Sequence, residues 1–213
     1  MPTLTWERLP APRREAVLAA AEAEFAARGF SGGSLNVIAR NAGVAKGSLF
    51  QYFTDKADLY AHLSELASRR IRVHMEERIG ALSTVDGFFP RLTELLLEWV
   101  QYFRTHEVER AVTAAVNLEL DAGARLAVRS VVNRHYVEVL RPMLEQAHAV
   151  GDLRADADVD AFLALLLLVL PHLALAPFNP GLDPVLGLAD SAPEQPEAAV
   201  RRLVAVFRTA FGS

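Results

Sequence analysis

Residues 34–56 contain two short runs of apolar residues at helical spacing, and they constrain the fold more than any other part of the sequence. The first run predicts a helix over about residues 35–42, because its apolar side chains recur at intervals of three and four residues. Ser34 stands where a hydroxyl can accept a hydrogen bond from the first turn, and Gly43 stands where a helix can end at positive φ without steric cost. A second short helix is predicted over residues 46–52.

The spacing of three residues predicts how these two helices meet. Two helices joined by a short turn cross steeply, which requires a small residue on the first helix, a glycine in the turn and a branched apolar residue on the second helix. Ala39, Gly43 four positions later and Leu49 six positions after that satisfy these requirements. The spacing therefore predicts a helix-turn-helix, although a helical hairpin with an ordinary solvated face would show the same spacing.

The outward side of the second helix carries residue types that suit contact with DNA. Lysine binds phosphate as a compact charge, glycine permits close approach, and serine, glutamine and aromatic side chains hydrogen-bond or stack. The two lysines of the chain, Lys46 and Lys56, both lie in this stretch and are predicted to anchor phosphates. Ser48, Gln51 and Tyr52 are expected nearer the bases or the backbone. The predicted DNA-binding residues are Ser34, Lys46, Gly47, Ser48, Phe50, Gln51, Tyr52 and Lys56.

A longer pattern surrounds the predicted helix pair. It consists of Gly29, Phe30, Ser34, Ile38, Ala39, residues 42–44 and 46–50, Tyr52, Phe53, Lys56 and Leu59. This pattern resembles the N-terminal domain of the tetracycline-repressor (TetR) family of bacterial regulators. Three positions depart from it: Phe50 replaces a more frequent Tyr, Tyr52 a frequent His, and Val37 a usual polar residue. The resemblance implies a homodimeric transcriptional regulator that binds a near-palindromic operator, either as a repressor released by a small molecule or as an activator of the same fold.

The composition of the chain favours an all-α protein with a sizeable core. Of its 213 residues, 52% are hydrophobic and 23% are charged, and the alternation that is typical of strands is absent. There is no cysteine, so a disulfide framework and a thiolate metal site are excluded. Because the sequence also begins without a basic and then apolar leader, we expect a cytoplasmic protein.

The charge of the chain is distributed unevenly. The net charge is −4, but residues 1–56 carry seven Lys and Arg against five acidic residues, so this part is +2 and the remainder is −6. Local charge matters more than the total for a protein that binds nucleic acid. The asymmetry agrees with a DNA-binding surface in the N-terminal part.

The sequence divides into two predicted domains. Residues 1–60 are predicted as a three-helix DNA-binding domain, and residues 1–10 within it as a disordered tail. Residues 61–213 are predicted as a helical ligand-binding and dimerisation domain. A long helix over about residues 56–79 joins them without a flexible linker. The other predicted helices cover about residues 12–28, 85–104, 107–120 and 122–150, one that begins at Asp156 or Asp158, and 197–211, with a loop over residues 179–196.

Residues 161–178 form an apolar run that approaches the length of a membrane span. Pro171 and His172 interrupt it and no basic cluster flanks it, so burial inside the protein is expected instead. The resemblance implies a homodimer interface built from the last two helices, about residues 158–176 and 197–211. A helical interaction protein or membrane-peripheral protein that does not bind DNA remains the alternative.

No catalytic motif is present, and none of the six histidines forms a pair at metal-ligand spacing, so neither an enzyme, a cofactor nor a bound metal is expected. The resemblance implies a small-molecule pocket in the C-terminal domain. Bulky aromatic side chains with a few polar groups suit such a pocket and a largely apolar effector, although each of them can equally be core packing. The candidates are Trp99, Phe103, His135, Tyr136 and His172.

Overall fold

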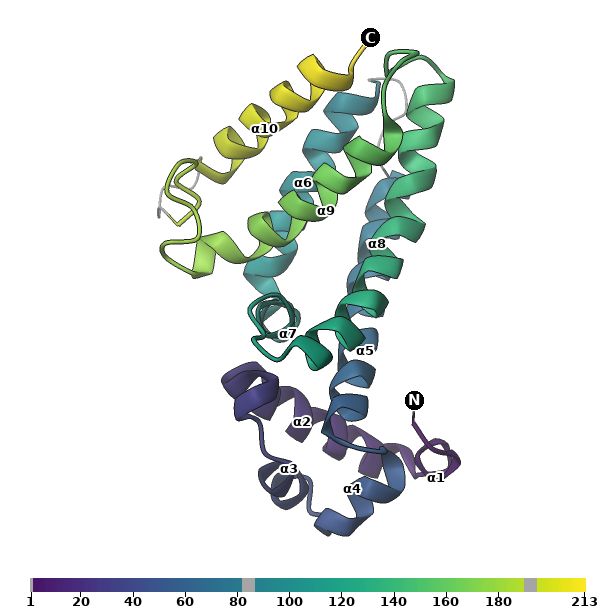
Figure 1. Ribbon diagram of the computed structural model, residues 1–213, viewed down its shortest axis with the longest axis vertical. Helices are drawn as coiled ribbons and strands as arrows, with labels where there is room; N and C mark the ends of the chain where they lie inside the picture. The colour runs from purple at the N-terminus through teal and green to yellow at the C-terminus, as the bar shows by residue number, and fades with distance from the viewer. Residues whose placement is uncertain (1, 82–86, 190–194) are drawn as a thin grey trace. The chain divides into compact units, whose positions relative to one another are not determined.

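The computed structural model describes residues 2–81, 87–189 and 195–213, and helices dominate these ranges, as Figure 1 shows. The prediction of an all-α fold is confirmed. Within the same ranges no strand forms, and one isolated bridge joins Leu153 to Gly212. The elements are α1 (Leu4–Glu7), α2 (Ala11–Gly32), α3 (Leu35–Asn41), α4 (Lys46–Tyr52), α5 (Lys56–Ala81), α6 (Phe88–Thr105), α7 (Glu107–Asn117), α8 (Ala122–Ala149), α9 (Val159–Leu175), the 3₁₀ helix η1 (Ala176–Phe178) and α10 (Gln195–Phe211).

The chain packs as two compact units. The first contains Met1–Arg70 and Glu107–Val132, and the second contains Ile71–His106 and Asn133–Ser213. The first unit therefore includes α7, which packs against α2, and the long helices α5 and α8 each contribute to both units. This division differs from that of the two predicted functional domains, whose boundary is at residue 60. The functional domains stay a prediction.

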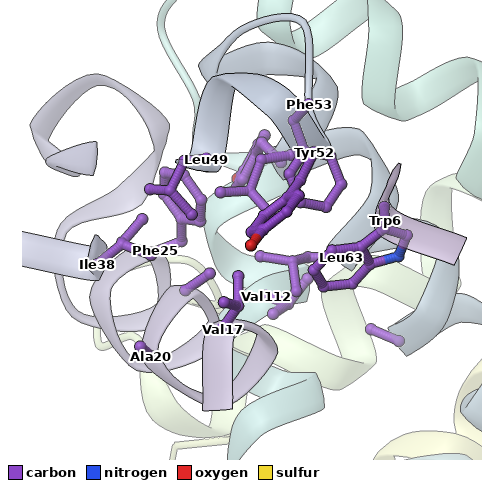
Figure 2. Packing of buried hydrophobic residues seen from close by; sticks show 14 of the residues in the cluster. Trp6, Val17, Ala20, Phe25, Ile38, Leu49, Tyr52, Phe53, Leu63 and Val112 are labelled. Carbon is purple, nitrogen blue, oxygen red and sulfur yellow. The ribbon is translucent and has the colours of Figure 1, made fainter. Parts of the chain in front are cut away.

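The core of the first unit is built on one face of α2. Val17, Ala21 and Phe25 recur every four residues and are at most 1% exposed. Side chains from α3, α4, α5 and α7 close over this face, and Figure 2 shows the cluster. Its buried members are Trp6, Val17, Ala20, Ala21, Phe25, Ile38, Ala39, Leu49, Tyr52, Phe53, Leu59, Tyr60, Leu63, Ala67, Val112, Val116 and Val128.

Residues 2–10 are ordered and include the helix α1, so the prediction of a disordered tail over residues 1–10 is wrong for them, and Met1 lies outside the described residues. α1 begins after Thr3, whose hydroxyl accepts a hydrogen bond from the Trp6 amide at 3.4 Å. The indole of Trp6 is 3% exposed and lies 4.8 Å from the ring of Phe53. Burial of this large apolar side chain offsets the loss of chain entropy that would otherwise leave the segment disordered.

Two glycines shape the end of α2. Gly29 has φ 65° and breaks the helix where the sequence predicted its end, and one further turn follows. At Gly33 a Cβ atom would lie 2.6 Å from Cδ1 of Phe25 and 2.9 Å from the carbonyl oxygen of Gly29. Gly33 therefore allows the chain to pass close over the buried Phe25 ring before α3 begins.

The second unit packs α6 against α9 and α10. Phe162 is fully buried, stacks on Phe211 at 4.4 Å and lies 5.2 Å from Phe207. The α9 helix begins after Asp158, whose carboxylate accepts a hydrogen bond from the Ala161 amide, as one of the two predicted starts required. The predicted helix start at residue 85 and part of the predicted loop, residues 190–194, lie outside the described residues.

Segment Val159–Phe178 is, by length and composition, the one described segment that could cross a membrane. Of the residues in an apolar stretch of 18 within this segment, 44% are buried inside the protein. Core helices of soluble proteins have the same length and hydropathy, so this segment by itself is weak evidence for a membrane span.

Candidate DNA-binding site

The pair α3 and α4 has the geometry that the spacing predicts. The Val44 amide donates to the carbonyl of Ala39 at 3.0 Å, and Gly43 in the turn has φ 66°. Ala39 and Leu49 are 3% and 2% exposed, because they face each other's helix at the crossing. The helix-turn-helix is therefore formed by the three residues on which the prediction depended.

The exposed side of α4 carries four of the predicted DNA-binding residues. Lys46, Gly47 and Gln51 are exposed, and the Phe50 ring is 49% exposed although it is large and apolar. An exposed aromatic ring between polar neighbours suits stacking or contact with a partner. Ser48 is half-buried on the edge of the same surface.

The prediction that Tyr52 faces outward is wrong. Tyr52 is 5% exposed, and its ring lies 5.8 Å from that of Trp6 in the core cluster, where Figure 2 shows both. The physical reason is the helical period, because a residue three positions after Leu49 shares its inward face. Tyr52 therefore helps to hold α4 in place, and it is not a candidate for base contact.

Ser34 lies at the start of α3, but its hydroxyl accepts no capping hydrogen bond from the described residues, contrary to prediction. Its backbone amide instead donates to Oε1 of Glu24 at 3.0 Å. Glu24 is 7% exposed and also lies 3.7 Å from the guanidinium of Arg28. The carboxylate of α2 thus fixes the entry to α3, which leaves the Ser34 hydroxyl available at the edge of the helix pair.

Lys56 lies at the start of α5 and is bound within the protein. Its Nζ donates to the carbonyl of Phe30 at 2.7 Å and to that of Gly33 at 3.3 Å, and it lies 4.4 Å from the centre of the Phe30 ring. An ammonium group has three N–H donors, so these contacts use two of them. Lys46, by contrast, makes no hydrogen bond or ion pair with any described residue, so its ammonium faces solvent.

A carboxylate that the sequence did not reveal holds the end of α2. Glu119, which is 6% exposed, accepts hydrogen bonds from the amides of Phe30 and Ser31 at 3.1 and 3.3 Å. It also accepts from the Ser31 hydroxyl at 2.7 Å and from the Asp121 amide at 2.9 Å. The carbonyl of Phe30 in turn binds Lys56, so Glu119 and Lys56 fix opposite sides of the same peptide segment.

A second polar contact, at an arginine side chain that is 43% exposed, joins α5 to α2 and α7. Arg70 donates to Glu109 at 2.6 Å and to Glu22 at 2.8 Å. Burial alone would lower the pKa of Arg70, but the hydrogen bonds and charges of the two glutamates outweigh it and raise the pKa. The arginine therefore stays charged, and it bridges the two helices that pack on α5.

The structure brings together three of the five ligand-binding candidates. The ring of Trp99 lies 4.8 Å from Phe103 and 5.7 Å from Tyr136, and its Nε1 donates to the carbonyl of Leu170 at 2.8 Å. His135 is buried on α8 and His172 is half-buried on α9. None of the five lines the described pocket of about 330 Å³, which is formed by Gly87, Phe88, Arg91, Met143, Gln146, Ala147, Val150 and Asp152. The assignment of an effector site to these candidates stays a prediction.

Comparison with known proteins adds independent information on the helix-turn-helix segment. A family model described as bacterial regulatory proteins, tetR family, matches residues 17–63. The HTH-type transcriptional repressor BepR of Brucella suis is 27% identical over 148 residues, which cover 68% of this chain and 61% of that repressor. The matched region thus spans less than two thirds of the repressor's length.

Solved structures share the fold along nearly the whole chain. A TetR-family regulator from Mesorhizobium loti is 17% identical with a TM-score of 0.70, covering 95% of this chain and 98% of that one. One from Rhodococcus sp. is 24% identical with a TM-score of 0.67, covering 95% and 100%. FadR from Bacillus subtilis, solved with stearoyl-CoA, is 15% identical with a TM-score of 0.67, covering 90% and 96%. The segment of residues 17–63 is thus similar to bacterial regulatory proteins of the tetR family, and the fold of the chain is the one that these solved regulators share.

Proposed function

We propose that this protein is a cytoplasmic, homodimeric transcriptional repressor that binds a near-palindromic operator and is released by a small, largely apolar effector. The observation that carries the proposal is the outer surface of α4. Lys46, Gly47 and Gln51 are exposed there, whereas Leu49 and Tyr52 anchor the helix in the core. A helix held in this way and lined with phosphate- and base-binding groups suits the major groove.

The proposed dimer uses α9 and α10, over about residues 158–176 and 197–211. Leu165 and Leu168 are 39% and 70% exposed one turn apart on α9, and Val206 is 63% exposed on α10. Apolar side chains that are exposed at helical spacing favour a partner surface, and a second copy of this chain supplies a self-complementary one. Two copies would place two α4 helices in successive major grooves, roughly 34–36 Å apart.

The proposed effector binds in the second unit, near Trp99, Phe103 and Tyr136. These three rings and the apolar α9 favour a hydrophobic ligand. FadR, which has the same fold, was solved with stearoyl-CoA, so this fold can hold a long apolar chain. The dimer can adopt a conformer in which the spacing of its two α4 helices does not match successive major grooves. An effector that binds this conformer more tightly than the DNA-binding one would shift the equilibrium toward it and so release the operator.

Replacement of Lys46 by alanine tests the proposed contact surface. Because the ammonium has no partner among the described residues, we expect unchanged stability. Operator affinity should fall, and the slope of log affinity against log salt should decrease by about one unit, as expected for the loss of one phosphate contact. The operator is obtained by selection from random duplex DNA, and the slope by anisotropy titration at several salt concentrations.

One result would contradict the proposed function, and another would contradict only the assignment of Lys46. A folded dimer that selects no sequence and binds duplex DNA without salt dependence, after refolding free of ligand, would exclude a DNA-binding function. Partition of the same protein into detergent would then favour the membrane-peripheral alternative for Val159–Phe178. A Lys46→Ala protein with the wild-type slope would exclude Lys46 from the phosphate contacts while leaving the function in place.

Gly47 provides a prediction in which stability and binding change in opposite directions. A Cβ built on Gly47 meets no heavy atom within 4 Å, so the fold does not require glycine there. Gly47→Ala should raise the free energy of unfolding by about 0.5–1 kcal/mol, because alanine is the better helix former. If α4 lies against DNA at this point, operator affinity should fall by about tenfold, the effect of one poorly fitting contact.

Denaturant unfolding and anisotropy on the same samples would measure both quantities. Gly43→Ala is the matched control, because Gly43 has φ 66° and alanine there should destabilise the turn. A Gly47→Ala protein that binds the operator as tightly as the wild type would show that α4 does not approach DNA closely at this position.

A further inference from the structure

The last turn of α4 is capped by the N-terminal segment of the chain. The final carbonyls of a helix have no partner within it and need donors from elsewhere. The Thr3 hydroxyl donates to the carbonyl of Gln51 at 2.6 Å, and the Thr3 amide donates to the carbonyl of Tyr52 at 3.0 Å. A residue 48 positions away in sequence therefore supplies the donors that the end of α4 lacks.

The same segment also packs against the inward face of α4 and the residue that follows it. The Trp6 ring lies 5.8 Å from that of Tyr52 and 4.8 Å from that of Phe53, with the His62 ring 5.8 Å away. Figure 1 shows α1 beside α4, and the contacts between these two helices agree. Thr3 thus connects both helices, because its hydroxyl accepts from the Trp6 amide while it donates to Gln51.

The α4 helix needs this support because it is short. It has seven residues, about two turns, and a helix of that length does not form by itself in water. At its start Ala45 supplies no side-chain cap, and its buried residues are Leu49 and Tyr52. Few contacts therefore determine the orientation of its exposed side. Two of them are made to Trp6, by Tyr52 at the end of α4 and by Phe53, the residue after it.

We infer that Thr3 and Trp6 are positioning residues for DNA recognition: they hold the C-terminal end of α4 so that Gln51 and Phe50 keep their orientation toward the operator. The inference rests on the proposed DNA-binding function. Neither residue contacts DNA in this assignment. Loss of the contact lets the last turn of α4 open, which weakens base readout more than attraction to phosphates.

Thr3→Val is the sharpest test, because the valine side chain keeps the shape of threonine but can neither donate to the Gln51 carbonyl nor accept from the Trp6 amide, while the backbone bond to the Tyr52 carbonyl is kept. In the DNA-free protein, amide hydrogen exchange over residues 46–53 should become about fivefold faster, the effect of losing one helix cap. Operator affinity should fall by a similar factor, whereas affinity for non-specific duplex DNA at the same salt concentration should stay within about twofold. Thr3→Ser should restore both values, and Trp6→Ala should give larger changes of the same kind.

Two controls separate positioning from general loss of stability. Leu4→Ala changes a side chain of α1 that is 68% exposed, and it should alter neither exchange nor binding. Val116→Ala on α7, where the side chain is 2% exposed, should lower global stability without changing the ratio of operator to non-specific affinity. Binding is measured well below the unfolding temperature of every variant.

The two readouts distinguish failure of this inference from failure of the proposed function. If the wild type binds the operator and Thr3→Val and Trp6→Ala leave both exchange over residues 46–53 and the affinity ratio unchanged, the inference is overturned. If no variant, including the wild type, binds DNA, the proposed function fails. Amide hydrogen exchange over residues 46–53 would then still show whether Thr3 stabilises the end of α4, but a role of Thr3 in DNA recognition would be excluded.

Discussion

Replacement of Glu119 by alanine is expected to lower the free energy of unfolding by about 3 kcal/mol. The carboxylate accepts hydrogen bonds from two amides and a hydroxyl at the end of α2, in Phe30 and Ser31, and from the Asp121 amide. Hydrogen bonds to a charged group contribute about 1.5–3 kcal/mol each, but they are not additive here, because water can reach some of the donors once the side chain is removed. Urea unfolding measures the change.

Glu119→Gln should have a smaller effect, about half of that of alanine. An amide has one acceptor oxygen and would turn an NH₂ group toward donors. The matched control is Glu107→Ala at the start of α7, where the side chain is 88% exposed and the nearest cation, Arg110, is 3.8 Å away. That change should stay within about 0.5 kcal/mol. An equal decrease in the free energy of unfolding at both positions would show that the hydrogen bonds of Glu119 do not stabilise the fold more than an exposed carboxylate does.

The contribution of Glu119 should also depend on pH. Burial alone would raise the pKa of Glu119, but hydrogen bonds from the Asp121 and Ser31 amides and the Ser31 hydroxyl outweigh it and hold the pKa below its usual value of 4.5. Because the folded pKa is the lower one, the ionised carboxylate stabilises the fold above pH 4.5. The stability difference between wild type and Glu119→Gln should therefore shrink as the pH falls through the folded pKa. A difference that grows on acidification would contradict this assignment.

The helix pair could be predicted from sequence because its information is local. Ala39, Gly43 and Leu49 lie within eleven residues, and their spacing alone determines the turn and the crossing. The same local rule identifies the error at Tyr52, since a residue three positions after a buried leucine shares its face. The period of the helix was a better guide to its orientation than the chemical character of the tyrosine.

Contacts between distant segments could not be predicted in the same way. Thr3 and Gln51 are 48 residues apart, and Ser31 and Glu119 are 88 residues apart. No repeat or spacing in a single sequence shows which helices will pack together, so the ordered α1 and the carboxylate at the end of α2 were both missed. Periodicity also shows that Trp99 and Phe103 face inward, but a packed core and a ligand pocket have the same apolar period.

Lys56 is where the second large effect is expected, and the structure changes the prediction made from sequence. A lysine that contacts only phosphate could be removed without loss of stability. Here Nζ binds the carbonyls of Phe30 and Gly33 and lies over the Phe30 ring. Lys56→Ala should therefore lower the free energy of unfolding by about 2 kcal/mol, from two charge-assisted hydrogen bonds and a cation–π contact that are partly compensated by water.

The proposed phosphate contact of Lys56 makes a separate prediction, because one N–H donor remains and the group lies at the start of α5, where the helix dipole favours an anion. In folded Lys56→Ala protein, operator affinity should fall by about tenfold and the salt slope by about one unit. Lys46→Ala is the comparison, with the same change of slope and no loss of stability. Loss of stability with an unchanged slope would make Lys56 a link between α2 and α5 alone. A changed slope at full stability would mean that Nζ leaves the two carbonyls for the phosphate, and that the contacts to Phe30 and Gly33 contribute little to folding.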